Sequence, residues 1–503
     1  MMKRLPTLAL LAVSILAFCT FAWWEQDDFY IHLQYVRNLL ADGEWSYTPG
    51  TPSYGTTSPL WILVVSLPGL LGVPLPLAAK GLSIGFAVGC VFLLMRARTL
   101  FRHPAIHAAA VLTLLADHWF RLASGSGMEA SMTAFLALAL GLSLLTQPRP
   151  TPLNMAAYGA LSGLLILSRP EFFVLPAILL FAPRASSPSA WLKGYAVLLF
   201  VLALVVVPWL WYALVHFGSI APNTIALKIA SSAKAPLTFV NILKALARQV
   251  FFFGTMYAPG LLAMAASAIV LLRSRRTIRP ALPLAVWGLI FFLPAMYVVI
   301  QARGGEGISY RYAAPVLPLL VLAGYRLMDQ GLASANRKLV SLAVTASVVW
   351  SLGAGVALSI AHTPSLKISR AYLNDTLVSY GRWLNQNTPP TALIGCYDVG
   401  AIAYYSRRPV LDLVGLNNPE VIPLIDPNER PRVNRAAIMK YRPDYLVSFA
   451  HGDTGQLYDG VPIVETLLTR EVQPFRFGSR AQAGESHPCH LWRLDWTGLR
   501  PTS

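Results

Sequence analysis

Two adjacent carboxylates, Asp27 and Asp28, are the residues most clearly able to do chemistry, and they stand in the stretch EQDDFY. Carboxylates can accept a proton, bind a hydroxyl or ligate a cation. The apolar run LPTLALLAVSILAFCTFAWW precedes them and has the roughly 20 residues needed to cross a bilayer. One carboxylate would suffice to cap a following helix, and two adjacent ones repel each other. The pair therefore favours a functional site at a membrane surface over a helix cap.

Two arginines could bring positive charge to the same surface. Arg169 in SRPE and Arg311 in SYRYAAP each stand at the predicted outer end of an apolar run. A planar guanidinium can bind two oxygens of a phosphate group. The alternative for both is snorkelling towards the membrane surface, and Arg169 could simply pair with Glu171. Tyr310 and Tyr312 flank Arg311 and favour a functional role for it.

Four further polar residues are weaker candidates. Glu129 follows small residues in SGSGMEAS, which indicates a backbone shaped for close approach, although it could be a mere first-turn acid. His32 lies one turn into the helix predicted after the carboxylates, where a structural role is the usual one. Lys228 in NTIALK is a third cation, and Asn223 in APNT more naturally caps the helix that follows.

The composition indicates that these residues belong to a membrane protein, whose membrane-spanning helices must position them. Of the 503 residues, 55% are hydrophobic and 13% are charged, about half the charge of a soluble enzyme. The net charge of +17 does not indicate nucleic-acid binding, because lysines and arginines gather in short clusters between apolar runs, as expected of cytoplasmic loops. The sequence contains no Walker A loop, no HExxH and no GxSxG motif.

Eleven apolar runs are suited to membrane spans, and we expect about eleven spans at residues 5–24, 76–95, 105–123, 130–146, 153–168, 171–183, 190–215, 257–272, 280–300, 313–328 and 338–361. The first run could be a signal peptide, but an uncleaved span is the better interpretation because many spans follow. The run from Ser58 is shorter and interrupted by Pro68, which favours a re-entrant or interfacial segment. With that segment not spanning, the basic clusters fall on one side, which is then cytoplasmic.

This orientation places the amino terminus inside and the candidate residues outside. The outer loop 25–58 carries an interfacial helix, with Phe29, Leu33, Val36 and Leu40 on one apolar stripe. Residues 1–361 would form the membrane domain. Residues 362–503 have polar loops and short β-rich runs between helical stretches, which predict an extracytoplasmic α/β domain.

Four cysteines are too few for a disulfide scaffold and lack metal-ligand spacing. Cys396 and Cys489 fall in the polar tail and could pair if that tail lies outside the cytoplasm. Sequence separation alone cannot decide whether they meet the geometry of a disulfide.

The segment DDFYIHLQYVRNLLADGEWSYTPGTPSYGTTSPLW, residues 27–61, resembles the first outer loop of the GT-C glycosyltransferases, especially the terminal β-(1→2)-arabinofuranosyltransferase branch. The later pieces GME, RPE, FGSIAPNTIALK, YRYAAPVLP and DVGAIAYYSRRPVLDLVGL are similar to that branch in order and spacing, so the resemblance covers nearly the whole chain. One departure is Ser53, which stands where the branch often has an acidic or otherwise polar residue before the turn that here contains Tyr54.

The resemblance implies an enzyme that moves a sugar from a polyprenyl phosphate to an acceptor hydroxyl. Asp27, which matches the first acidic residue of the family's loop, would be the base. Asp28 would orient it, bind a sugar hydroxyl or ligate a divalent cation. Arg311 and Arg169 would bind the lipid phosphate. The other substrate-binding candidates are Glu171, Glu129, His32, Tyr54, Asn223 and Lys228.

The resemblance also implies the partners and the location. The donor would be polyprenyl-phospho-arabinofuranose, with a mannosyl or other lipid-phosphate sugar as the alternative. The acceptor would be an envelope glycan or a surface protein at the outer face of a bacterial cytoplasmic membrane. A transporter or flippase for a lipid-linked sugar is the rival class, but it usually shows internal repeats, and none is visible.

Overall fold

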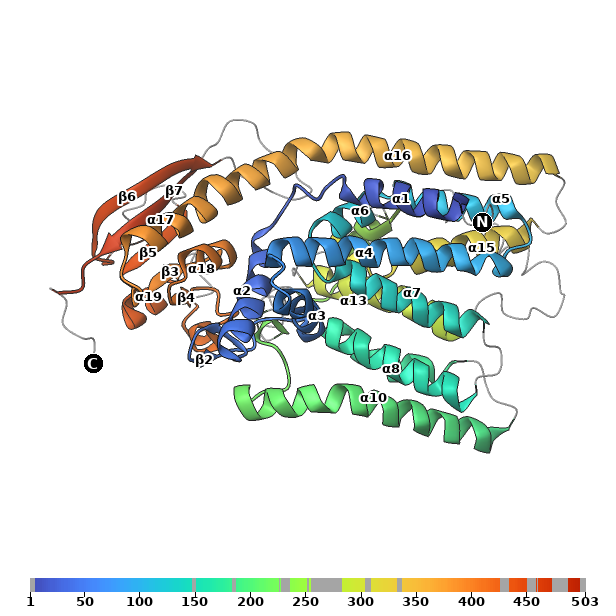
Figure 1. Ribbon diagram of the computed structural model, residues 1–503, viewed down its shortest axis with the longest axis horizontal. Coiled ribbons are helices and arrows are strands. Elements are labelled where there is room, and N and C mark those ends of the chain that lie inside the picture. The colour runs from blue at the N-terminus through green and yellow to red at the C-terminus, as the bar shows by residue number, and fades with distance from the viewer. Residues whose placement is uncertain are drawn as a thin grey trace.

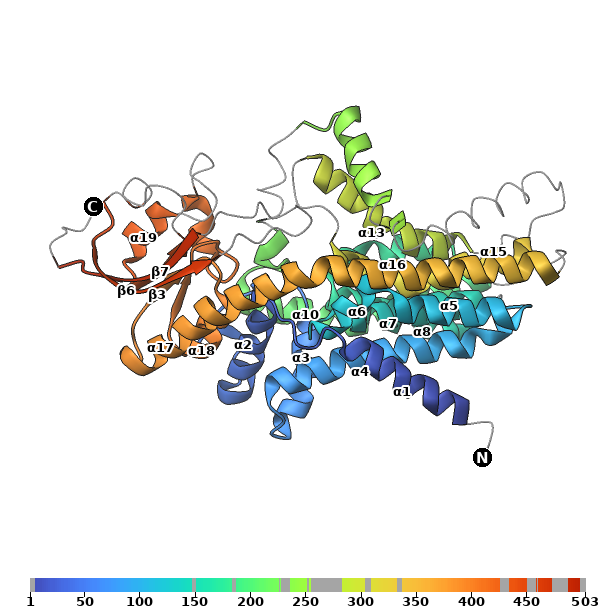
Figure 2. The ribbon, with the colours of Figure 1, turned by 90° about the horizontal axis from the view of Figure 1, so that it is seen from above.

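The computed structural model describes residues 5–146, 151–182, 187–225, 227, 236–250, 253–254, 283–303, 309–332, 337–425, 434–449, 458, 460–472 and 487–497. A bundle of helices occupies one end of the molecule, and a region with a β-sheet occupies the other (Figure 1). The view turned by 90° gives the same division, with α16 extending from the bundle to the sheet region (Figure 2). The amino terminus lies beside the bundle, far from the sheet (Figure 1).

The bundle consists of helices that run side by side along the long axis of the molecule (Figure 1). They are α1 (Leu5–Cys19), α4 (Leu75–Arg96), α5 (Pro104–Ala116), α7 (Ala130–Thr146), α8 (Pro152–Ser168), α10 (Pro188–Phe217), α13 (Leu284–Ala302), α15 (Leu317–Gly331) and α16 (Arg337–Tyr372). Four helical stretches of the described residues are long and apolar enough to cross a bilayer: Leu75–Leu100, Pro188–Phe217, Leu284–Ala302 and Arg337–Asn387. Shorter apolar helices accompany them. The predicted helical membrane architecture is confirmed, while the count of eleven spans stays a prediction.

Three of the predicted spans are interrupted. The run 105–123 forms α5 and then α6 (His118–Gly125), because the Asp117 carboxylate accepts the Phe120 N–H at 2.6 Å and starts a new helix. The run 171–183 forms a 3₁₀ turn (Pro170–Val174) and the short helix α9 (Leu175–Leu179). The run 313–328 starts at the last residue of α14 (Tyr310–Ala313), passes through a turn at residues 314–316 and continues in α15. The run 257–272 lies outside the described residues.

Helices α2 (Asp27–Asp42) and α3 (Pro59–Leu70) lie where the bundle meets the sheet region (Figure 1). Helix α2 ends at Gly43, whose left-handed φ of 70° favours glycine. The amphipathic pattern predicts one apolar face and one wet face, but the structure buries every residue from Phe29 to Val36. The expected polar face is covered because α18 (Gly400–Ser406) packs on it. The hairpin strands β1 (Ser46–Thr48) and β2 (Thr51–Pro52) follow α2.

The carboxyl-terminal region contains a five-stranded mixed sheet of order β4-β3-β5-β7-β6. Strands β4 (Val410–Asp412), β3 (Ile394–Cys396) and β5 (Tyr445–Phe449) are parallel, while β7 (His487–Leu494) and β6 (Ile463–Val472) are antiparallel. The helices α17 (Ser379–Asn387), α18 and α19 (Arg435–Tyr441) accompany the sheet. The predicted combination of helices and strands after the bundle is therefore present.

Two features of this region differ from the pattern expected from sequence. Helix α16 passes through residue 362 without a break and reaches α17 through the π-helical turn Leu373–Val378. Cys396 on β3 and Cys489 on β7 are separated by strand β5, and the two cysteines form no disulfide with each other. One continuous apolar core, which includes Phe29, Leu319 and Leu491, extends from the bundle into the sheet region.

Candidate active site

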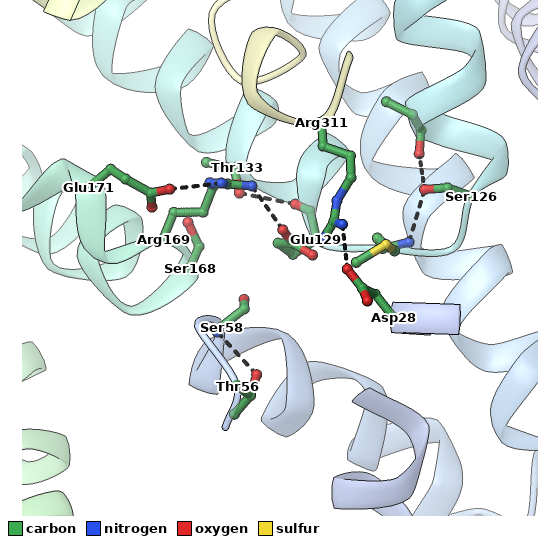
Figure 3. A network of polar contacts seen from close by, with 12 residues as sticks. Asp28, Thr56, Ser58, Ser126, Glu129, Thr133, Ser168, Arg169, Glu171 and Arg311 are labelled. Carbon is green, nitrogen blue, oxygen red and sulfur yellow. Dashed lines mark hydrogen bonds and ion pairs between the residues drawn. The ribbon is translucent and has the colours of Figure 1, made fainter. Parts of the chain in front are cut away.

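A cluster of charged side chains lies where the start of α2, the end of α8 and the short helix α14 come together (Figure 3). Arg311 Nη1 lies 2.5 Å from Asp28 Oδ2. The Arg169 guanidinium lies between two carboxylates, with Nη1 3.0 Å from Glu129 Oε1 and Nη2 2.9 Å from Glu171 Oε1. The structure thus brings together five residues that the sequence marks as candidates, and we call these five the charged cluster.

Each of these side chains comes from the end of a different element. Asp28 lies in the first turn of α2, Arg169 directly follows α8, and Arg311 lies in the short helix α14. Glu129 stands in the turn between α6 and α7, two residues after Gly127. A side chain at Gly127 would collide with the Phe29 ring at 2.6 Å, and its φ of 76° is left-handed. The small residues before Glu129 thus let the backbone pack closely against Phe29, while a contact of Glu129 with a sugar hydroxyl stays a prediction.

Several buried polar atoms in and around the charged cluster have no hydrogen-bond partner among the residues described. They are His32 Nδ1, Ser58 Oγ, Glu129 Oε2, Arg169 Nε and Arg311 Nε. Ser58, on the loop before α3, faces the charged cluster (Figure 3). A buried polar atom without a partner costs about 1–3 kcal/mol, and such atoms are rare in native proteins. Their concentration here indicates a site that a polar ligand completes.

The electrostatics of the site favour the charged form of Glu129 and the neutral form of His32. Burial would raise the pKa of Glu129, but the Arg169 guanidinium, with smaller contributions from His32 and Arg311, holds that pKa below its usual value. Burial lowers the pKa of His32, although Glu129 opposes the shift. His32 is therefore neutral at pH 7, and one of its ring nitrogens can accept a hydrogen bond while the other donates.

Asp27 does not join the charged cluster. Its carboxylate accepts the backbone N–H groups of Gly400 at 2.7 Å and Ala401 at 2.8 Å, at the start of α18. A side chain at position 400 would collide with the Asp27 carbonyl oxygen, so only glycine fits there. Burial, and then the nearby Asp398, raise the pKa of Asp27 to about 8 even though the two N–H donors favour the charged form.

Further contacts extend this junction between α2, its following loop and the carboxyl-terminal region. The Tyr47 hydroxyl donates to the Val399 carbonyl at 2.8 Å, and Arg37 Nη1 donates to the Tyr404 carbonyl at 2.6 Å. The Tyr35 hydroxyl donates to Asn417 Oδ1 at 2.8 Å. Sequence analysis missed these contacts. Only the spacing of tyrosines along the outer loop could have hinted at them.

The remaining predicted residues lie elsewhere. The Tyr54 hydroxyl accepts the Trp209 indole N–H at 2.8 Å, and its ring stacks on Phe217. The Asn223 side chain donates to the Leu416 carbonyl at 2.9 Å, so it fastens a loop of the sheet region, and its predicted role as a helix cap stays a prediction. Lys228 lies outside the described residues. Among the described residues, the side-chain hydrogen bonds of Tyr54 and Asn223 go to Trp209 and Leu416 and not to the charged cluster.

A divalent cation at Asp28 stays a prediction. Within the described part of the chain, no three His, Cys, Asp or Glu side chains converge as a metal site would require. Asp28 and Glu129 are each paired with an arginine. A cation would have to replace those arginines as the partner of the carboxylates.

Comparison with solved structures defines the class of fold. ArnT from Cupriavidus metallidurans, in a crystal structure bound to undecaprenyl phosphate, matches 97% of this chain and 98% of its own chain with a TM-score of 0.60 at 14% identity. The oligosaccharyltransferase AglB from Archaeoglobus fulgidus, in complex with an inhibitory peptide and a dolichol-phosphate, matches 89% of this chain and 70% of its own with a TM-score of 0.55 at 14% identity. The chain therefore has the GT-C fold of a multi-pass membrane protein, as its sequence predicts.

Comparison at the sequence level gives a more particular relative. The terminal β-(1→2)-arabinofuranosyltransferase of Mycobacterium tuberculosis is 27% identical over 250 residues, which is 45% of this chain and 39% of the length of that enzyme. The match thus spans well under half of the relative. Residues 368–488 match a family described as Domain of unknown function (DUF8728).

Proposed function

We propose that this protein is a GT-C glycosyltransferase that moves a sugar from a polyprenyl-phosphate donor to an acceptor hydroxyl. The observation that carries the proposal is the charged cluster with its unpartnered buried polar atoms, at the end of a bundle with this fold. Sugar hydroxyls and phosphate oxygens are the kinds of groups that such atoms bind. Two arginines can neutralise a leaving phosphate as the glycosidic bond breaks.

Arg311 is the better candidate for binding the donor phosphate. Its side chain is 21% exposed and its partner Asp28 is 44% exposed, so a ligand can reach the pair. Arg169 is only 4% exposed and already contacts two carboxylates. Arg169 would therefore position Glu129 and Glu171 and contribute charge at longer range.

Asp28 is the better candidate for the base, although the family's loop pattern favours Asp27. Both oxygens of Asp27 are occupied by the start of α18, whereas Asp28 belongs to the charged cluster. A donor phosphate that binds Arg311 would compete with Asp28 for it. The Asp28 carboxylate would then lose its ion pair and become a stronger base for the acceptor hydroxyl. Asp27 would act as a positioning residue.

His32 and Glu129 would bind hydroxyls of the sugar. The unpartnered His32 Nδ1 and Glu129 Oε2 are a ring nitrogen and a carboxylate oxygen, and both can accept a hydroxyl proton. We propose arabinofuranose as the sugar, on the basis of the mycobacterial relative. A mannosyl or other lipid-phosphate sugar is the alternative, and a divalent cation at Asp28 remains part of the hypothesis.

The distribution of positive charge supports a proposal for the location and orientation. We propose a bacterial cytoplasmic membrane, with the amino terminus inside and the charged cluster and sheet region outside. The acceptor would then be an envelope glycan or a surface protein. Cysteines introduced at Arg98 and at Arg493 should react with an impermeant maleimide only from the inside and only from the outside, respectively. Labelling of both from the same side would reject this orientation.

The decisive experiment uses purified protein in nanodiscs, radiolabelled polyprenyl-phospho-arabinofuranose and a panel of glycan and protein acceptors. Asp28→Asn should lower transfer by about 10²–10⁴-fold, the usual contribution of a general base. Asp27→Asn is the matched control and should retain more activity. If Asp27→Asn loses transfer and Asp28→Asn keeps it, the roles are reversed. If the wild type transfers no arabinofuranose, mannosyl and other lipid-phosphate donors are tested next.

Adding EDTA to the same assay tests the divalent cation. Loss of transfer that Mg²⁺ or Mn²⁺ restores would support a cation at Asp28. Unchanged transfer would assign the phosphate charge to the arginines alone.

A further inference from the structure

A groove lies between the segment after α1 and the outer part of α16. Two cavities of about 450 and 570 Å³ share Trp23 and Lys367 in their walls, so they form one continuous groove. The groove is separate from the charged cluster, since none of its lining residues belongs to that cluster. We call it the α16 groove.

The chemistry of the α16 groove changes along its length. One end is lined mainly by apolar groups, including Phe21, Ile360 and Pro364. The other end is lined by Lys367, Arg370 and Asp375 together with Trp23. The Arg370 guanidinium lies 5.7 Å from the centre of the Trp23 ring.

The length of α16 places this change near the surface of a bilayer. Its 36 residues make a helix about 54 Å long, which exceeds the roughly 30 Å hydrocarbon core. A span that begins near Arg337 would leave the hydrocarbon about 20 residues later, close to Ile360. Lys367 and Arg370 would then stand at the level of the lipid headgroups. Tryptophan and arginine are both favoured at that level.

We propose that the α16 groove holds a phospholipid of the bilayer. Its phosphate would lie between Lys367 and Arg370, and an acyl chain would cover Phe21 and Ile360. Asp375 is the acidic residue that lines the polar end of the groove. The two cations, Lys367 and Arg370, outnumber it, so that end carries a net positive charge. The proposal requires only that the chain sits in a membrane and does not depend on glycosyl transfer.

A lipid in this position would support the segment that carries the candidate base. Residues 23–28 connect the α16 groove to the charged cluster, with Trp23 in the groove and Asp28 in the cluster. Between them, the Trp24 ring contacts the Tyr310 ring at a centroid distance of 5.8 Å. Glu25 pairs with Lys80 at 3.1 Å. The lipid would fasten the first residue of this segment at the membrane edge.

Binding of phosphatidylglycerol to delipidated, purified protein, followed by native mass spectrometry, tests the proposal. The double substitution Lys367→Gln and Arg370→Gln should weaken one tight lipid site by roughly thirtyfold, because each basic residue near an anionic lipid contributes about fivefold. The pair Arg382→Gln and Lys440→Gln removes two exposed cations elsewhere and should leave that site unchanged. Thr363→Trp fills the apolar end and should also displace the lipid.

Three results would overturn the proposal. The first is equal lipid affinity of the wild type and the Lys367→Gln and Arg370→Gln protein. The second is the same loss in the Arg382→Gln and Lys440→Gln control, which would indicate a general effect of charge. The third is displacement of phosphatidylglycerol by undecaprenyl phosphate at much lower concentration, which would make the lipid carrier of the donor the occupant.

Discussion

The charged cluster and the junction between α2 and α18 meet at the start of α2, and they differ in how far their buried polar atoms are hydrogen-bonded. In the charged cluster, ion pairs leave neighbouring buried atoms such as Glu129 Oε2 and Arg311 Nε without partners. In the junction with α18, both oxygens of Asp27 accept backbone N–H groups, and Tyr47 and Arg37 also reach carbonyl partners. Buried polar atoms that lack hydrogen-bond partners can bind a ligand. Buried polar atoms whose hydrogen bonds are satisfied within the protein hold its parts together. Adjacent carboxylates can therefore serve different purposes.

The strongest test of this contrast is the removal of positive charge from the charged cluster. Arg311→Gln should reduce glycosyl transfer by about 10²–10³-fold, the typical effect of deleting one group that stabilises developing charge. Arg311→Lys should recover part of the rate, because it restores the charge but not the forked geometry. The measurement is initial rates in nanodiscs together with the melting temperature. A large loss of stability with normal rates of the folded fraction would assign Arg311 to structure.

The second test crowds the junction. Gly400→Ala places a methyl group against the Asp27 backbone carbonyl, and relief of that overlap should cost about 1–3 kcal/mol. The melting temperature should fall, and kcat should fall because α2 carries Asp28. Gly353→Ala is the matched control, since Gly353 is also helical and has open space around it. If Gly400→Ala and Gly353→Ala had the same melting temperature, the contact of α18 with α2 would be unimportant for stability.

A third test uses pH. The pKa of Asp27 is raised from 3.8 to about 8 in the folded protein, so the fold favours the protonated carboxyl. Its contribution to stability is fully present below about pH 3.8 and is lost as pH rises through about 8. We expect the free energy of unfolding, and with it the melting temperature, to fall between about pH 4 and pH 8, with a slope no steeper than the limit of about 1.4 kcal/mol per pH unit for one proton. Asp27→Asn should flatten this dependence, and parallel profiles would contradict the assignment.

The smallest effect is expected from a single hydrogen bond of the junction. Tyr47→Phe removes the donor to the Val399 carbonyl and should cost about 1 kcal/mol of stability while leaving KM unchanged. His32→Gln, beside the charged cluster, should instead raise KM with little change in melting temperature. If Tyr47→Phe changed KM and His32→Gln did not, the division into a binding region and a structural region would be wrong.

Sequence patterns predicted the class of protein and several local features of its fold. The apolar runs predicted a helical membrane protein, and the small residues before Glu129 coincide with a turn that packs closely against Phe29. The candidates Asp28, Glu129 and Arg311 came from their positions at the ends of apolar runs, and the structure gathers them. The interruption at Asp117 was missed because a capping carboxylate inside an apolar run leaves hydropathy almost unchanged.

What the sequence by itself determined is the membrane class, the approximate ends of α4, α7, α8 and α10 and the identity of the charged residues, because hydrophobicity and helix propensity act over neighbouring residues. Only the tertiary structure decided which charges meet. The partners of Asp27 lie 373 and 374 residues away, and Arg311 lies 283 residues from Asp28. Pairing over such separations depends on how the helices and the sheet pack. Asp27 and Asp28 are neighbours in the first turn of α2, yet the packing places Asp27 against α18 and Asp28 in the charged cluster.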